Sequence, residues 1–204
     1  MDNCIFSVYG ISIRHPLNWR VYLDPKRGFN LLGGFIRIEN YVSGVGAEVS
    51  MSINWDTVPS DSESFPKRYC ESIEAQYQKQ FKKNHSYGIE SAGIINHCGI
   101  PAAYVISNCS GSQLLVHNKK DCQAVKVMHL AFYHESTGRA VVGTVIAKKE
   151  IVDEQEEFLK SLLFTLRAED YTVDCQAIGA LEAGKLAESR KGLVRKLFSS
   201  KKAG

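Results

Sequence analysis

Residues 97–134 include seven histidine and cysteine residues, the side chains that zinc prefers. They are His97, Cys98, Cys109, His117, Cys122, His129 and His134. His97 and Cys98 are adjacent, so their side chains point apart in an extended chain, and His129 and His134, five residues apart, lie on opposite faces of a strand. His134-Glu135 does not begin the H-E-x-x-H helix of a zinc protease. This spacing favours ordinary surface and core residues, and we expect neither a metal nor another cofactor.

Motifs of nucleophilic catalysis and phosphate binding are missing from the sequence. Ser110-Gly111-Ser112 is not a G-x-S-x-G elbow, and residues 28–34 lack the G-x-G-x-x-G pattern. A catalytic cysteine needs a histidine beside it in space, which one sequence does not reveal. The six cysteines, without a C-x-x-C pair, are Cys4, Cys70, Cys98, Cys109, Cys122 and Cys175. We therefore predict that the protein is not an enzyme.

The composition is that of a globular protein, with 44% hydrophobic and 23% charged residues. The start of the chain lacks a basic segment followed by an apolar run, and no apolar run approaches the roughly 18 residues that span a bilayer. We expect a cytoplasmic protein whose cysteines are reduced thiols.

Charge is divided unevenly along the chain. The net charge is +3, but residues 185–204 carry seven basic residues against one glutamate, a net +6, so residues 1–184 carry −3. The seven basic residues are Lys185, Arg190, Lys191, Arg195, Lys196, Lys201 and Lys202. Because the basic character belongs to this end alone, we expect no nucleic-acid binding by the body of the protein.

Two interpretations of the basic C-terminal tail remain open. Apolar residues recur among its basic ones, which suits an amphipathic helix on an anionic membrane surface or an acidic partner. Gly179, Gly184 and Gly192 weaken such a helix, since each glycine costs roughly 1 kcal/mol relative to alanine. A solvated tail, or a helix that packs back on the body, is therefore the favoured alternative.

Alternating hydrophobicity predicts most strands. The clearest runs from Ala47 to Trp55, with alternate residues facing the core. Residues 29–39 are apolar but contain Gly33-Gly34, which indicates a bulge or tight turn between two strands. A hairpin is predicted where residues 123–135 and 139–147 flank Ser136-Thr137-Gly138. The remaining predicted strands are residues 4–8, 11–14, 19–23, 87–95, 102–107 and, as a short edge strand, 114–117.

Two helices are predicted. After a polar break at residues 59–64, aromatic and aliphatic residues recur every fourth position from Phe65 to Phe81, which gives an amphipathic helix of about 18 residues. Asp153 with Glu156 resembles a capping box, and an apolar face follows as far as Leu166.

Residues 11–19 indicate how the domain begins. Ile11 and Ile13 share one face of a strand, and Pro16 then bends the chain. His15 is interpreted as a turn residue, and Trp19 as a core anchor whose replacement by alanine costs about 3–5 kcal/mol if the ring is buried.

These features resemble the PsbP/Mog-type fold family, which includes photosystem II extrinsic protein P, a yeast Ran-binding nuclear import factor, and bacterial members of unknown function. The resemblance rests on Ile11, Ile13, Pro16, Trp19, Phe158, Ser161, Leu162 and Phe164. It implies an α+β fold, an α/β/α sandwich around a mostly antiparallel sheet. We expect one domain over residues 1–167, with residues 168–204 as a basic tail.

Two classes of function follow. The leading one is a non-catalytic protein-interaction or accessory module with a protein partner, by analogy with the two named family members. The alternative is a small-molecule-binding protein or unrecognised enzyme with a pocket between sheet and helix. Its lining candidates are Trp19, Tyr22, Trp55, Tyr69 and Tyr104, although such aromatic residues are more often core.

Overall fold

The computed structural model describes residues 2–23, 29–42, 46–80, 86–112 and 123–170. The strands are β1 (Asn3–Val8), β2 (Ile11–Pro16), β3 (Arg20–Leu23), β4 (Gly33–Val42), β5 (Gly46–Thr57), β6 (Ser86–His97), β7 (Ile100–Ser112), β8 (Gln123–His134), β9 (Arg139–Lys148) and β10 (Arg167–Ala168). The helices are α1 (Ser64–Gln80), the 3-10 turn η1 (Glu135–Thr137) and α2 (Lys149–Leu163). No helix among the described residues is long and apolar enough to cross a membrane.

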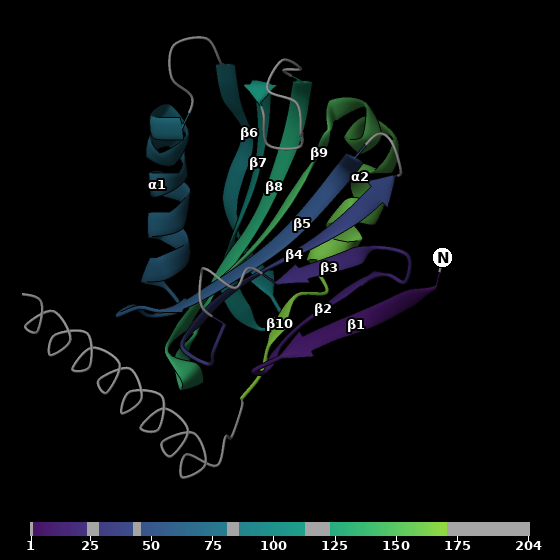
Figure 1. Cartoon of the computed structure of the whole chain (residues 1–204). Helices are drawn as coiled ribbons and strands as arrows, with labels where there is room; N and C mark the ends of the chain where they lie inside the picture. The colour runs from purple at the N-terminus through teal and green to yellow at the C-terminus, as the bar shows by residue number, and fades with distance from the viewer. Residues whose placement is uncertain (1, 24–28, 43–45, 81–85, 113–122, 171–204) are drawn as a thin grey trace, which may run out of the picture. The chain divides into compact units, whose positions relative to one another are not determined.

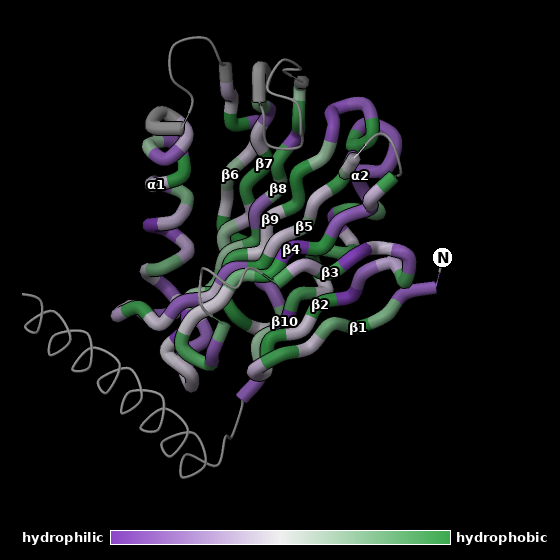
Figure 2. Tube along the Cα trace, viewed as in Figure 1, coloured by the Kyte–Doolittle hydropathy of each residue, from purple (hydrophilic) through white to green (hydrophobic). Residues whose placement is uncertain are grey.

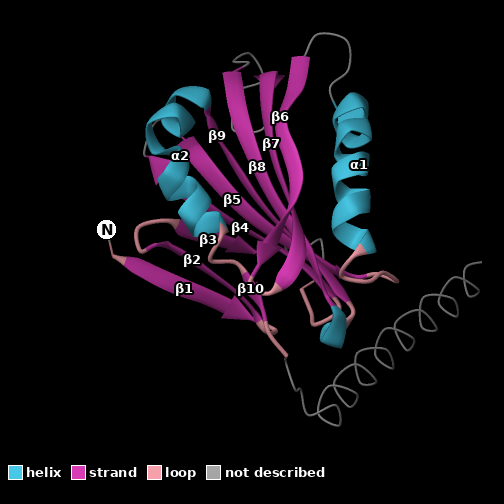
Figure 3. Cartoon of the chain, turned by 180° about the vertical axis from the view of Figure 1, so that it is seen from behind, coloured by secondary structure: helices cyan, strands magenta, loops and turns pink. Residues whose placement is uncertain are grey.

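Two antiparallel sheets form the frame. The larger has seven strands in the order β3-β4-β5-β9-β8-β7-β6, and the smaller has the order β1-β2-β10. Helix α1 packs on β6, β7 and β8, whereas α2 packs on β8, β9, β5 and on β2 of the small sheet. The helices therefore lie on opposite faces of the large sheet (Figures 1 and 3). The predicted α+β fold with a largely antiparallel sheet is confirmed.

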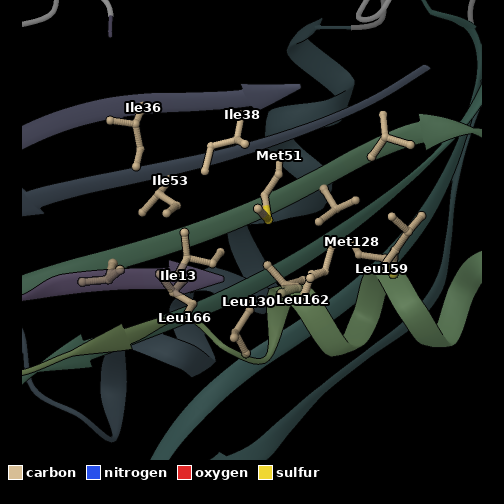
Figure 4. Packing of buried hydrophobic residues seen from close by; sticks show 14 of the residues in the cluster. Ile13, Ile36, Ile38, Met51, Ile53, Met128, Leu130, Leu159, Leu162 and Leu166 are labelled. Atoms are coloured by element: carbon tan, nitrogen blue, oxygen red, sulfur yellow. The ribbon is translucent and has the colours of Figure 1, made fainter. Parts of the chain in front are cut away.

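The main core lies between the large sheet and the layer formed by α2 and the small sheet. Figure 4 shows side chains of β4, β5 and β8 meeting those of β2 and α2. Alternate residues of β5 from Ala47 to Trp55 point into this core, as predicted. Gly143 makes room for α2, because an added Cβ would lie 2.8 Å from both Leu163 and Leu166.

Helix α1 forms a second, smaller core on the other face. Ile73 and Tyr77 are buried against Val105, Val125 and Val127. Figure 2 shows hydrophobic and hydrophilic residues interleaved along α1, as expected for a helix with one covered face. The polar break before α1 caps its first turn, because the Asp61 carboxylate accepts hydrogen bonds from the backbone N–H groups of residues 63 and 64 at 3.0 and 2.6 Å.

The predicted start of the last helix is wrong by four residues. Helix α2 begins at Lys149, directly after β9, and Gln155 interrupts it with φ −130° and ψ 20°. Glu156, expected in a capping box with Asp153, instead reaches the buried ammonium group of Lys126 at 2.8 Å. The capping pattern therefore marks the kink rather than the beginning of the helix.

Trp55, not Trp19, is the core tryptophan. Trp55 is 1% exposed and donates its indole N–H to the Asn30 carbonyl at 3.0 Å. Gly34 packs directly on its ring, where an added Cβ would lie 2.1 Å from Cζ2. The glycine pair thus begins β4 after a tight turn at Asn30. Trp19 is only half-buried against the core edge, so its expected role as the main anchor is corrected.

His15 is also corrected, because it belongs to β2 and is not a turn residue. It is 5% exposed, and its ring nitrogens lie 3.3 and 3.5 Å from the sulfur of Cys4, its partner across the hairpin. The four described cysteines, Cys4, Cys70, Cys98 and Cys109, are free thiols. The domain boundary predicted at 167/168 stays a prediction, since residues 171–204 lie outside the described residues.

We expect Trp55→Ala to destabilise the protein by about 3–5 kcal/mol, because it removes a fully buried indole and leaves a cavity beside Gly34. Trp19→Ala should lower the free energy of unfolding by clearly less than Trp55→Ala does, because the Trp19 ring is already partly exposed to water. Chemical denaturation of both variants measures the difference, and equal losses would contradict the assignment of the core.

Candidate functional site

A groove runs between α1 and the part of the large sheet that α1 leaves uncovered. Its volume is about 780 Å³, and it is open to solvent rather than enclosed. The lining residues are Phe35, Ser52, Asn54, Asp56, Val58, Pro59, Phe65, Arg68, Tyr69, Ser72, Gln76, His129, Ala140, Val142 and Thr144. Aromatic rings from α1 form one wall, and polar side chains of β5 and β9 form the opposite side.

His129 lies at the inner side of this groove in a network of hydrogen bonds. Its Nδ1 lies 3.0 Å from the Tyr69 hydroxyl and 3.3 Å from the Thr144 hydroxyl. Its Nε2 lies 2.7 Å from the Tyr77 hydroxyl, which is also 2.7 Å from the Ser107 hydroxyl. The imidazole thus links two tyrosines of α1 to strands β7, β8 and β9.

The direction of these hydrogen bonds follows from their last acceptor. Ser107 donates to the Val127 carbonyl at 3.5 Å, and its oxygen therefore accepts from Tyr77. Tyr77 in turn accepts from His129, which places the imidazole proton on Nε2. Nδ1 is then the acceptor for Tyr69. Both nitrogens are engaged, so the ring has no lone pair ready for a ligand in the groove.

Burial sets the ionisation of this network. It lowers the pKa of His129 to about 4, so the imidazole is neutral at pH 7. It also raises the pKa of Tyr77 to about 12 and that of Tyr69 above its ordinary value, with each phenol remaining protonated. A neutral, fully hydrogen-bonded network fixes the position of α1 on the sheet. The groove beside it offers aromatic faces and polar hydrogen-bonding groups.

A row of residues, each paired with the next on the neighbouring strand, connects the His129 network to the edge of the sheet formed by β3. The strand register pairs Tyr22 with Arg37, Arg37 with Ser52, Ser52 with Thr144, and Thr144 with His129. We call these five residues the polar row. Directly paired residues share a face of a sheet, so the polar row runs along the α1 side from β3 to the groove.

Stacked arginine and tyrosine side chains mark the outer end of the polar row. The Arg37 guanidinium lies 5.4 Å from the centre of the Tyr22 ring, and Arg20 lies 4.4 Å from that of Tyr41. Arg37 also pairs with Glu39 at 3.1 Å. Tyr41 is 40% exposed, and the main contacts of α1 are with β6, β7 and β8. The edge therefore presents ordered aromatic and cationic groups to solvent.

The five predicted pocket residues do not come together. Only Tyr69 lines the groove between sheet and helix. Trp55 and Trp19 pack in or against the main core, and Tyr104 contacts Phe164 at a ring distance of 5.2 Å on the α2 side. Tyr22 lies at the outer end of the polar row. The prediction missed His129, Thr144 and Ser52, which no local pattern connects because strand register alone brings them together.

The histidines and cysteines weighed for zinc are likewise dispersed. His97 bonds the Leu166 carbonyl at 2.7 Å on the α2 side, whereas Cys109 is buried beneath α1. Cys98 occupies a hairpin turn with φ 55° and is exposed. Within the described part of the chain, no three His, Cys, Asp or Glu side chains gather so that they could hold a metal ion. His117 and Cys122 lie outside the described residues.

The basic residues of the tail also lie outside the described residues, so their predicted contact with a membrane or an acidic partner stays a prediction. These residues are Lys185, Arg190, Lys191, Arg195, Lys196, Lys201 and Lys202.

The lowered pKa of His129 predicts that acid destabilises the fold. The unfolded imidazole titrates near its model value of 6.5, and the folded one near 4. Between these two pH values the unfolded state binds more protons than the folded state. The contribution of His129 to the free energy of unfolding is therefore fully present above about pH 6.5, and on the order of 3 kcal/mol of it is lost as the pH falls to 4. His97 and His134, whose pKa values burial also lowers, contribute in the same direction.

His129→Gln isolates the contribution of this residue. The variant should be less stable at pH 7, because Tyr69 and Tyr77 lose their partner, yet lose less stability than the wild type between pH 7 and pH 4.5. Urea denaturation at several pH values measures both effects, with His134→Gln as the half-buried control. A His129→Gln profile parallel to that of the wild type would contradict the assignment.

Comparison with known proteins identifies the fold. No family model matches the chain, and no curated protein matches it. The solution structure of cyanobacterial PsbP from Synechocystis sp. PCC 6803 is similar at 9% identity and a TM-score of 0.60, over 82% of this chain and 92% of that one. A Pseudomonas aeruginosa protein of unknown function, described as a putative regulator, is 13% identical with a TM-score of 0.51, over 82% and 98%. A mutant of the protein Mog1 is 12% identical with a TM-score of 0.49, over 83% and 97%. At such identities the likeness concerns the fold, and the chain has a PsbP-like fold, as its sequence predicts.

Proposed function

We propose that the protein is a non-catalytic interaction module, and that a protein partner docks on the α1 side of the large sheet around the polar row. The observation that carries this proposal is the Arg37–Tyr22 stack on β4 and β3, beside an open groove, with a second stack of Arg20 on Tyr41 at the same edge of the sheet. Tyrosine and arginine are among the residue types enriched at the positions that contribute most of the free energy of protein binding.

Order at this surface supports a docking role. Arg37 is held by both Glu39 and the Tyr22 ring, although its side chain is 48% exposed. Strand register fixes the backbone beneath it. Side chains that already have their bound geometry lose less conformational entropy on association. The surface is thus suited to contact a partner without rearrangement.

Charge indicates the chemistry of the partner. The carboxylate of Glu39 is only 9% exposed and is engaged by Arg37, while Arg20 in the described residues has the Tyr41 ring as its contact. The cationic edges of both stacks therefore face solvent more than the acidic group between them does. A partner surface with acidic side chains next to apolar ones complements this arrangement.

Charge reversal tests the proposal. Arg37→Glu should weaken the partner's binding at least about tenfold, because it removes a stacked cation and opposes an acidic surface. Lys160→Glu, which changes charge equally on α2, should leave the dissociation constant nearly unchanged. The partner is captured from the native cells with the wild-type protein, identified and purified. It is then titrated against each variant by calorimetry. Equal dissociation constants for Arg37→Glu and Lys160→Glu would overturn the proposed surface.

A small-molecule ligand is the second candidate function, because the groove volume of about 780 Å³ falls in the range of ligand sites. Its aromatic wall and polar floor suit a flat, hydrogen-bonding molecule. Native mass spectrometry of protein isolated from its own cells tests this. A bound mass that is lost in Tyr69→Ala would favour the ligand over the protein partner.

A further inference from the structure

A second pocket lies on the small sheet, away from the polar row. Its volume is about 280 Å³, and it is lined by Ile5, Ser12, Ile13, Arg14, Thr165 and Arg167. The small sheet formed by β1, β2 and β10 is separate from the large one (Figure 1). No carboxylate is among the lining residues, so the polar groups of the pocket are two guanidiniums and two hydroxyls.

Strand register brings the two arginines together. Ser12 pairs with Arg167, and Arg14 pairs with Ile5 on the other side of β2. The Arg14 amide also donates to the Thr165 hydroxyl at 2.8 Å, which places residue 165 beside Arg14. Arg14 and Arg167 are therefore diagonal cross-strand neighbours, about 7–8 Å apart along the backbone. Two guanidiniums at this spacing can reach one ligand placed between them.

The guanidinium of Arg167 is held in place by the end of α2. Its Nη1 donates to the carbonyls of Phe164 at 2.6 Å and Leu166 at 2.8 Å, and it lies 3.4 Å from Nε2 of the buried His97. These bonds use one of its three nitrogens and leave Nε and Nη2 for a ligand. Within the described residues, the Arg14 side chain is exposed and has no hydrogen-bonding or ionic partner. The pocket thus holds two positive charges and no negative one.

We propose that this pocket binds the phosphate group of a phosphate monoester. Arginine forks match phosphate oxygens in paired hydrogen bonds, and a dianion neutralises both guanidiniums at once. The Ser12 hydroxyl adds a third donor, whereas the Thr165 hydroxyl already donates to the Leu162 carbonyl at 2.6 Å. Ile5, which is 63% exposed, borders the pocket and contacts the organic part of the ligand.

Inorganic phosphate and a phosphate-bearing lipid are the two probes. The full chain is titrated with inorganic phosphate by calorimetry at constant ionic strength, with chloride as the control anion. In parallel, it is sedimented with phosphatidylcholine vesicles with and without phosphatidic acid. Arg14→Gln removes one exposed charge from the pocket, and Arg20→Gln removes one from β3. The midpoint of thermal unfolding is measured for each variant to check that it is folded.

Three outcomes decide the proposal. Saturable phosphate binding that is weakened about tenfold in Arg14→Gln, but not in Arg20→Gln, supports a site for soluble phosphate esters. Sedimentation with phosphatidic acid that falls in Arg14→Gln alone, without binding of inorganic phosphate, supports the same site with a lipid headgroup as ligand. If both variants behave alike in both measurements, the pocket is not a phosphate site and the proposal is overturned.

Discussion

The two faces of the seven-stranded sheet are covered unequally, and the rest of the structure follows from this constraint. On one face, α2 and the small sheet together bury a continuous apolar surface that includes Ile36, Met51 and Leu130. On the other, α1 alone covers β6, β7 and β8. Because one helix is narrower than seven strands, β3, β4 and β5 keep an accessible face, and the groove forms where α1 ends its contact with the sheet.

The face of the sheet that α1 leaves uncovered tolerates contact with water, because its side chains are polar and paired. Ser52 and Thr144 face this side, whereas their neighbours Met51, Ile53 and Val145 face the core. The half-buried ring of Tyr22 lies beneath the Arg37 guanidinium. At the boundary with α1, the network around His129 satisfies the polar groups that burial would otherwise penalise. The surface is consequently ordered, amphipathic and accessible, which are the properties of a docking site.

The small sheet carries a different kind of chemistry. The β1–β2 hairpin forms most of this sheet, and β10 returns the chain from α2 to β2, which pairs residue 167 with residue 12. The same return gives the carbonyls at the end of α2 to Arg167. The proposed phosphate pocket and the proposed docking surface thus lie on separate sheets of the fold.

The sequence by itself determined the features that repeat locally: the alternation of β5, the four-residue period from Phe65 to Tyr77, and the fold class. Each of these reflects one element with one apolar face, so its periodicity can be detected within a short stretch of the sequence. Only the tertiary structure decided which tryptophan is central, where α2 begins, and that Tyr22 shares a row with His129. Those outcomes depend on strand register and on close approaches such as that of Gly34 to Trp55, which join residues far apart in the chain and leave no local pattern.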